Sequence, residues 1–254
     1  MTLQKIPGFE STAYAYQGGR VVWAGLCGTT DHPRNAWAPW QPSVLTQAFD
    51  IHRLQVGAAT CLALLQPDAG HPLQTGLHAK GLLLWLTGQT MAFPLNHAAS
   101  RFDAARDALA QRDLAAFETT ALRLLGLGNG LTPSGDDFVG GIMFTLAHLR
   151  RLSPEQAWLV NLPQVACQLS QAAQTTTNVI SAALLDDLLA GSSYRVLHAL
   201  LAALDSQNHR QIETATADLL TLGASSGADL LAGVLLALCA YPAAAAVSMR
   251  PNRH

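Results

Sequence analysis

The sequence predicts an α+β fold: a strand-rich N-terminal part followed by an all-helical C-terminal part with a pseudo-repeated helix pair. Short apolar runs separated by turn residues occupy the first hundred residues, and long alanine- and leucine-rich segments with helical periodicity follow. Within the second part, one helical segment recurs further along the chain. We therefore divide the chain into a strand-rich domain, residues 1–99, and a helical domain, residues 100–254.

Four apolar runs of the first part are expected to form strands. They are Ala13–Tyr16, Val21–Leu26, Gly81–Leu86 and Met91–Pro94. Gly18-Gly19 separates the first two runs with hairpin spacing, and Thr87–Thr90 separates the last two in the same way. Between the two predicted hairpins, Ser43–Leu65 is ambiguous and could hold a helix.

Helix-start signals punctuate the second part. Ser100 with Asp103 can begin a helix, Ser153-Pro154-Glu155 can begin another, and Thr177 can cap a segment that ends at Gly191. Further helices are expected over Tyr194–Leu204 and His209–Leu222.

The segment Leu230–Met249 carries no charge and is long enough to cross a bilayer. Pro242 interrupts it, alanines follow that proline, and Asp229 immediately precedes it. We therefore predict a buried helix that ends near Ala240 and continues into a loose tail, with no membrane span.

The repeat links SGDDFVGGIMFTL, residues 134–146, to SGADLLAGVLLAL, residues 226–238, without a gap. Asp137 matches Asp229, and Gly141 matches Gly233. In each copy the aspartate and the glycine are four residues apart and share a helix face. Glycine in a helix costs about 1 kcal/mol relative to alanine, so its matched placement suggests a close backbone approach. We expect the two helices to cross at the glycines and to bring both aspartates to one end.

The loop GLGNGLTPSGDD, residues 126–137, precedes the first of these helices. Its alternating glycines leave main-chain N–H groups free at the positive end of a helix dipole, which suits phosphate or a carboxylate. The loop lacks the lysine of a P-loop and the context of a dinucleotide fingerprint.

Two acidic residues complicate an anion site at this loop. Asp136 and Asp137 repel an anion unless a divalent cation or a protonated group lies between them and the anion. Either they hold a Mg²⁺ ion that bridges to the ligand, or they accept hydrogen bonds from a ligand or a neighbouring chain. No cofactor other than this possible Mg²⁺ is indicated.

A capping box, serine followed three residues later by an acid, offers a structural alternative at both copies. We favour it for Ser226 with Asp229, and a ligand site for Ser134 with Asp137, because the first copy adds glycines and Asp136. The candidate catalytic residues are Asp136 and Asp137. The candidate substrate-binding residues are Gly128, Asn129, Gly130, Thr132, Ser134, Gly135, Ser226 and Asp229.

The amino-acid composition indicates which partners the chain binds and in which cellular compartment it works. Charged residues make up 13% of the chain and hydrophobic residues 50%, so we expect another subunit or a second copy to cover part of the surface. The formal net charge is -2 with no basic cluster, which argues against nucleic-acid binding. The four scattered cysteines suggest no disulfide framework, and a reducing cytoplasm fits them best.

The run Leu124–Phe138 resembles the signature of the AllH family, whose member is a subunit of oxamate carbamoyltransferase. The likeness extends to Ser226–Asp229 and loosely to the strand-rich part, although Asn129 stands where the motif often has proline.

This resemblance implies a carbamoyltransferase subunit in anaerobic purine or allantoin breakdown, where oxalurate and phosphate become oxamate and carbamoyl phosphate. It also implies other subunits, one of them similar to a CoA ligase. The loop would then hold a small anionic substrate and act by positioning it. Two alternatives stay open: a stand-alone Mg²⁺-dependent hydrolase with paired aspartates, and a non-catalytic scaffold subunit.

Overall fold

A computed structural model describes residues 2–24, 31–37, 39–40, 49–66, 80–92 and 94–240. These residues form a small antiparallel sheet followed by helices, so the predicted α+β class is confirmed. The strands are β1 (Gln4–Lys5), β2 (Tyr14–Gln17) and β3 (Arg20–Trp23). The helices are α1 (Ile51–Leu65), α2 (Gly81–Leu86), α3 (Ala99–Ala110), α4 (Leu114–Leu122), α5 (Ser134–Leu152), α6 (Leu162–Thr176), α7 (Val179–Leu189), α8 (Arg195–Ser206), α9 (His209–Leu220) and α10 (Ser226–Ala240), with 3-10 turns η4 (Leu95–Ala98) and η5 (Ala157–Leu159).

The first predicted hairpin is present. β2 and β3 pair antiparallel with Gln17 opposite Arg20, so Gly18-Gly19 forms a two-residue turn. Both glycines have positive φ angles, 59° and 80°, which a turn that follows the strand twist requires. β1, which the sequence did not signal, pairs with the other edge of β2. Residues 25 and 26 of the second predicted strand lie outside the described residues.

The second predicted hairpin is wrong, because Gly81–Leu86 forms helix α2 and Met91 and Ala92 lie in no strand. Gly88, with φ of 75°, does not make a hairpin turn but ends the helix. Its N–H bonds Trp85 O, and the N–H of Gln89 bonds Leu84 O, which is the Schellman pattern of a helix C-terminus. A short apolar run bounded by glycines fits a buried strand and a buried helix equally well.

Most of the later helices match the expected positions, and two of the start signals are wrong. Ser153-Pro154-Glu155 begins no helix; η5 follows, and α6 begins at Leu162 with Pro163 in its first turn. Thr177 ends α6 instead of capping α7, and Asn178 is the cap, accepting from the N–H groups of Ile180 and Ser181. The ambiguous segment contains α1, and the predicted tail after Ala240 lies outside the described residues.

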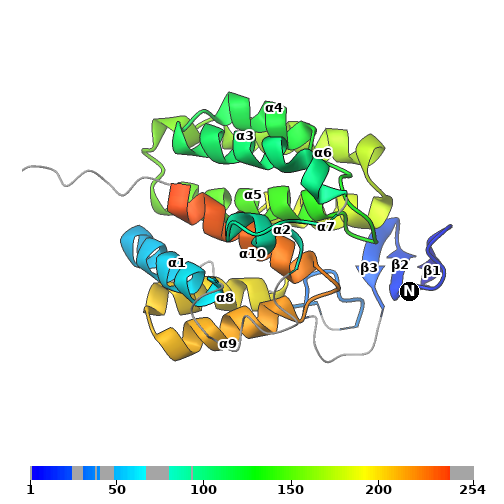
Figure 1. The fold of residues 1–254 in the computed structure, drawn as a ribbon. Coiled ribbons are helices and arrows are strands. Elements are labelled where there is room, and N and C mark those ends of the chain that lie inside the picture. The colour runs from blue at the N-terminus through cyan, green and yellow to red at the C-terminus, as the bar shows by residue number, and fades with distance from the viewer. Residues whose placement is uncertain are drawn as a thin grey trace, which may run out of the picture.

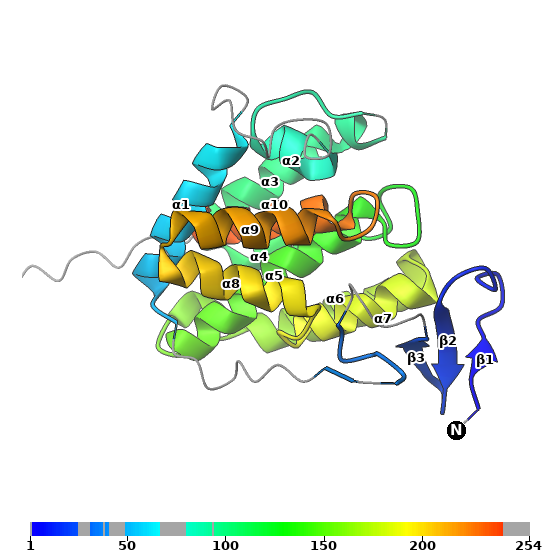
Figure 2. The ribbon, with the colours of Figure 1, turned by 90° about the horizontal axis from the view of Figure 1, so that it is seen from below.

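The buried helices α5 and α10 pack against each other in the middle of the molecule (Figure 1). α3 and α4 lie on one side of this pair, and α1, α8 and α9 lie on the other, while the small sheet sits at one edge beside α7 (Figure 2). A helical hairpin precedes each central helix: α3–α4 before α5, and α8–α9 before α10. No helix in the described part of the chain is both long enough and apolar enough to span a membrane.

Candidate functional site

The two central helices meet at their matched glycines. A Cβ atom added to Gly141 would lie 2.3 Å from Leu230 O, and one added to Gly233 would lie 2.3 Å from Phe138 O. These distances leave no room for any side chain, so the predicted crossing at the glycines is confirmed. Asp137 and Asp229, one turn earlier on each helix, therefore come close enough for their charges to interact.

Hydroxyl groups surround the two carboxyl groups in a reciprocal way. The hydroxyls of Ser226, from the start of α10, and of Thr132 stabilise the charged form of Asp137 on α5. The hydroxyls of Ser134, from the start of α5, and of Ser225 do the same for Asp229 on α10, which also accepts from the N–H of Leu82 at 2.7 Å. Each helix thus supplies a serine to the aspartate of the other helix.

The capping box is the interpretation favoured for the second copy, where the hydroxyl of Ser226 instead contacts Thr132 and acts on Asp137. The first copy, for which the capping box is the alternative, has the reciprocal arrangement. The N-cap of α5 is Pro133, and no side chain caps the helix. The hydroxyl of Ser134 acts across the helix crossing on Asp229 instead of on its own first turn. The serine-to-aspartate spacing of the two copies thus builds a contact between two helices.

Asp136 lies in a different environment from its neighbour. One of its oxygens accepts from the N–H of Gly126 at 2.7 Å, and the other accepts from the hydroxyls of Thr177 and Ser181. The side chain therefore ties the glycine loop to the junction of α6 and α7. Asn178 adds a second tie, because its side-chain amide donates to Leu131 O at 2.8 Å.

Burial sets the electrostatics of the aspartate pair. Desolvation raises the pKa of Asp137 well above its usual value, and the nearby charge of Asp229 adds to this effect. Desolvation also raises the pKa of Asp229, to about 6, against the opposing hydrogen bond from Leu82. The Oδ2 atoms of both residues are buried and have no hydrogen-bond partner in the described part of the chain.

A cavity of about 340 Å³ opens beside this pair. One wall is the glycine loop, another is the matching loop before α10, and aromatic side chains from the sheet and from the start of α8 close it. The lining residues are Tyr14, Trp23, Asn129, Gly130, Leu131, Thr132, Tyr194, Leu222, Gly223, Ala224, Ser225 and Ser226. We call this cavity the two-loop pocket.

The predicted residues divide into those that line the two-loop pocket and those behind it. Asn129, Gly130, Thr132 and Ser226 line it. Gly128, Ser134, Gly135, Asp136, Asp137 and Asp229 are not among its lining residues. Two of these glycines shape the loop: a Cβ on Gly128 would lie 2.7 Å from Ser134 N, and one on Gly135 would lie 1.9 Å from Leu124 O.

Main-chain N–H groups of both loops are available to a ligand. In the described residues, no acceptor is found for the N–H groups of residues 128–132 or 223–226. Both loops lead into helices, so each set of N–H groups lies at the positive end of a helix dipole. Residues 129–132 of the first loop and 223–226 of the second line the two-loop pocket.

Sequence reasoning missed Tyr14, Trp23 and Tyr194. The hydroxyls of Tyr14 and Tyr194 are 3.4 Å apart, and desolvation raises the pKa of both phenols. Their position depends on how the sheet packs on the helical part, which no local pattern encodes. The second loop could have been found, because the residues just before Ser226 correspond to the glycine loop before Ser134.

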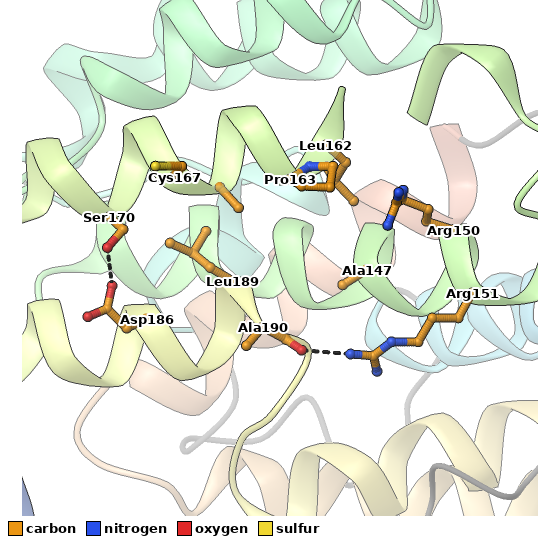
Figure 3. A pocket seen from close by; sticks show the side chains of 11 residues that line it. Ala147, Arg150, Arg151, Leu162, Pro163, Cys167, Ser170, Asp186, Leu189 and Ala190 are labelled. Atoms are coloured by element: carbon orange, nitrogen blue, oxygen red, sulfur yellow. Dashed lines mark hydrogen bonds between the residues drawn. The ribbon is translucent and has the colours of Figure 1, made fainter. Parts of the chain in front are cut away.

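A second hollow lies away from these residues, between the C-terminal part of α5 and helices α6 and α7 (Figure 3). It has a volume of about 460 Å³. Arg150 and Arg151 stand at one end, and Ser170, hydrogen-bonded to Asp186 at 2.6 Å, stands at the other. Arg151 donates to Ala190 O at the end of α7. None of the predicted site residues lines this hollow.

The structure is that of an α+β protein in which a pseudo-repeated pair of helices crosses and the two-loop pocket lies at the N-terminal end of that pair. Residues 124–238 match the model of a family described as oxamate carbamoyltransferase subunit AllH. The resemblance expected from the glycine loop is thus confirmed, over a range that contains both copies of the repeat. The match covers a little under half of the 254 residues, and the family is described as a subunit. Neither a curated protein nor a solved structure matches the chain.

Proposed function

We propose that the chain is a subunit of an oxamate carbamoyltransferase system and that its two-loop pocket binds the small anionic substrate. The observation that carries this proposal is the convergence of two helix-start loops on one cavity of about 340 Å³. Among the described residues, no acceptor is found for the N–H groups of residues 129–132 or 223–226 of these loops. A cavity of this size suits a small molecule. Helix N-termini bind phosphate and carboxylate groups through such N–H groups.

The chemistry needs positioning and charge stabilisation more than a nucleophile from the protein. When oxalurate reacts with phosphate, the bond between the carbamoyl carbon and the oxamate nitrogen breaks, and a bond from that carbon to a phosphate oxygen forms. The released nitrogen gains the proton that phosphate gives up. Fixed N–H donors can hold the reacting anions in place and stabilise charge that develops on oxygen.

In this proposal Thr132 and Ser226 contact the ligand, and Asp136 positions the loop. Thr132 and Ser226 line the pocket, and their hydroxyl oxygens are 2.6 Å apart. Asp136 is 2% exposed and is engaged by three donors, so it holds Gly126 in place and leaves ligand contacts to the pocket wall. Tyr14, Trp23 and Tyr194 would exclude water from the bound ligand.

Calorimetric titration of the purified chain tests this proposal. The ligands are oxamate, phosphate and carbamoyl phosphate, each with and without Mg²⁺. We expect saturable binding that Thr132→Val weakens at least about tenfold, since valine keeps the shape and removes one hydroxyl. The matched control is Thr119→Val on the exposed face of α4, where the hydroxyl bonds only Ala115 O; it should bind as the wild type does.

The outcomes separate the proposal from its alternatives. Binding that requires Mg²⁺ would favour the metal-dependent hydrolase; the described residues contain no group of three or more His, Cys, Asp or Glu side chains placed to hold a metal. A folded chain that binds none of the three ligands would contradict the proposal and favour a scaffold role. Equal binding by wild type and Thr132→Val would remove the two-loop pocket as the site.

A further inference from the structure

The aspartate pair behind the two-loop pocket is buried and has no cationic partner in the part of the chain that the structure describes. Asp137 is 6% exposed and Asp229 is 0% exposed. The titratable groups whose charges act around Asp137 are Asp136 on its own helix, Asp229 from α10, Tyr14 from β2 and Tyr194 from the start of α8. Ionising Asp137 adds a negative charge to this group, and none of these residues can supply a positive one.

Among the described residues, Arg34 is the cation that acts at the edge of this group, and it is already engaged. Arg34 interacts with Tyr14, but its guanidinium bonds both carboxylate oxygens of Asp187. Two buried carboxylates with unpaired oxygens and no cation cannot both ionise at an acceptable cost. The pair therefore keeps a proton. We place it on Asp137, because the carboxylate of Asp229 accepts the N–H of Leu82 and no main-chain N–H in the described residues donates to the side chain of Asp137.

The proton on Asp137 decides the direction of the hydroxyl pair at the pocket wall. Thr132 and Ser226 each have one hydroxyl proton, and both hydroxyls interact with Asp137 as well as with each other. The bond between them uses one of the two protons. If Asp137 is ionised, the remaining proton points back to its carboxylate, and the pocket meets only oxygen lone pairs. If Asp137 is protonated and donates, the remaining proton points into the pocket.

We propose that protonated Asp137 acts as a positioning residue that orients the Thr132–Ser226 hydroxyl pair as a donor into the two-loop pocket, which makes anion binding depend on this proton. This inference rests on the proposed function, since it concerns the same ligand. It removes the conflict between an anionic ligand and two adjacent aspartates without a bridging metal ion: Asp136 is occupied by donors of its own, and Asp137 carries no charge.

The ligand class follows from the donor set. Main-chain N–H groups of two loops and one outward hydroxyl are all donors, so the pocket selects a small anion rich in acceptor oxygens. Carboxylate and phosphate share this chemistry. Oxamate is the better probe, because its carboxylate does not titrate near neutral pH, whereas phosphate does.

Titration of oxamate at several pH values, from about 6 to about 10, tests the inference on the full chain. We expect the wild-type affinity to fall as the pH rises through the titration of Asp137. At high pH the affinity for oxamate should fall by about tenfold per pH unit. Binding should then take up as much as one proton, which is measured by comparing binding heats in buffers with different ionisation heats. Asp137→Asn should bind oxamate with no such pH dependence and no proton uptake, because its amide is a permanent neutral donor.

Two results would overturn the inference. One is loss of oxamate binding in an Asp137→Asn variant whose circular dichroism and thermal unfolding match the wild type. The other is a wild-type affinity for oxamate that stays constant from about pH 6 to about 10 with no proton uptake, a result that needs no variant and holds whether or not Asp137→Asn folds. Failure of the wild type to bind oxamate at any pH would instead reject the proposed function, and the inference with it.

Discussion

Asp136 and Asp137 have the same type of side chain and lie in the same turn of α5, but their carboxyl groups have different hydrogen-bond partners. Asp136 has two carboxylate oxygens engaged by three donors, whereas Asp137 keeps one buried oxygen without a partner. Successive residues of a helix point in directions about a quarter-turn apart, so one faces the α6–α7 junction and the other faces α10. The sequence pointed to both residues, but the identity of a residue does not reveal which donors surround it.

We expect Asp136→Ala to lower the free energy of unfolding by about 2–4 kcal/mol, because it leaves the N–H of Gly126 and two hydroxyls without their acceptor. Urea denaturation measures this change. The control is Asp107→Ala on the exposed face of α3, which should change stability by less than about 0.5 kcal/mol. An Asp136→Ala variant as stable as this control would show that the three hydrogen bonds do not hold the loop.

Buried histidines form a second unusual group of residues. His198 is 2% exposed, its ring packs between Trp40 and Phe144, and neither ring nitrogen has a partner in the described residues. Desolvation lowers the pKa of His198 to about 3, and it lowers the pKa of His148 to about 4 and of His32 to about 3. These imidazoles are therefore neutral in the folded chain.

The histidines should make the protein acid-labile. Since their usual pKa is 6.5, the unfolded chain binds more protons than the folded chain below that pH, and stability falls as the pH drops from about 6.5 toward about 4. Each histidine contributes up to about 1.4 kcal/mol per pH unit. The raised pKa values of Asp137 and Asp229 act in the opposite direction, for Asp229 between its usual value of 3.8 and about 6, so the net loss of stability is smaller than the histidines alone would cause.

His198→Phe should reduce this acid lability and leave stability at neutral pH unchanged or higher, because it removes two unsatisfied buried nitrogens and keeps the ring contacts. Thermal unfolding at several pH values measures both effects. His52→Phe, on the exposed face of α1, is the matched control for the substitution itself. A marked loss of stability in His198→Phe at neutral pH would mean that the ring nitrogens have an unseen partner, such as a buried water molecule.

At the scale of the secondary-structure element, the length of a sequence pattern determined whether the prediction drawn from it was correct. α5 and α10 were predictable with their crossing because thirteen aligned positions, residues 134–146 and 226–238, carried the signal. α2 was not, because the five apolar residues between Gly81 and Thr87 fit a strand or a helix. Its helical form depends on a distant contact, the bond from Leu82 N to Asp229, which no local reading contains. Tyr14, Trp23 and Tyr194 were missed for the same reason.

The crossing of α5 and α10 at their glycines can be tested by substitution, and the neighbouring glycine on α5 provides a control. Gly141→Ala should lower the free energy of unfolding by about 2–4 kcal/mol, because the new Cβ would lie 2.3 Å from the main-chain oxygen of Leu230 and would push α5 from α10. Gly140→Ala gains the same helix propensity, but its Cβ meets the mobile end of the Leu188 side chain. We expect a smaller loss for Gly140→Ala in chemical denaturation. Equal losses of unfolding free energy in the two variants would contradict the conclusion that main-chain atoms limit how closely α5 and α10 approach.

At the scale of the whole molecule, the helices of the first hundred residues share the main core with the helical part. Leu54 and Cys61 of α1 and Leu82 of α2 belong to the same buried cluster as α5 and α10. The sheet belongs to a separate, small cluster in which Ile6 and Val21 pack on Ile180 and Leu184 of α7. The division at residue 99 therefore stays a prediction about which part of the chain folds by itself.

Two truncations test that division. Deleting residues 1–23 removes the sheet and only one side of the small cluster, so we expect a folded helical protein with one cooperative transition and lower stability. It should also lose oxamate binding, because Tyr14 and Trp23 leave the two-loop pocket. Deleting residues 1–99 additionally removes α1 and α2 and exposes the buried faces of α8 and α10 to water. We expect this fragment to lose its cooperative transition, as followed by circular dichroism during heating. If residues 100–254 instead unfold cooperatively near the wild-type temperature, then α1 and α2 contribute little to the core, and the boundary drawn from the sequence is the true limit of the folding unit.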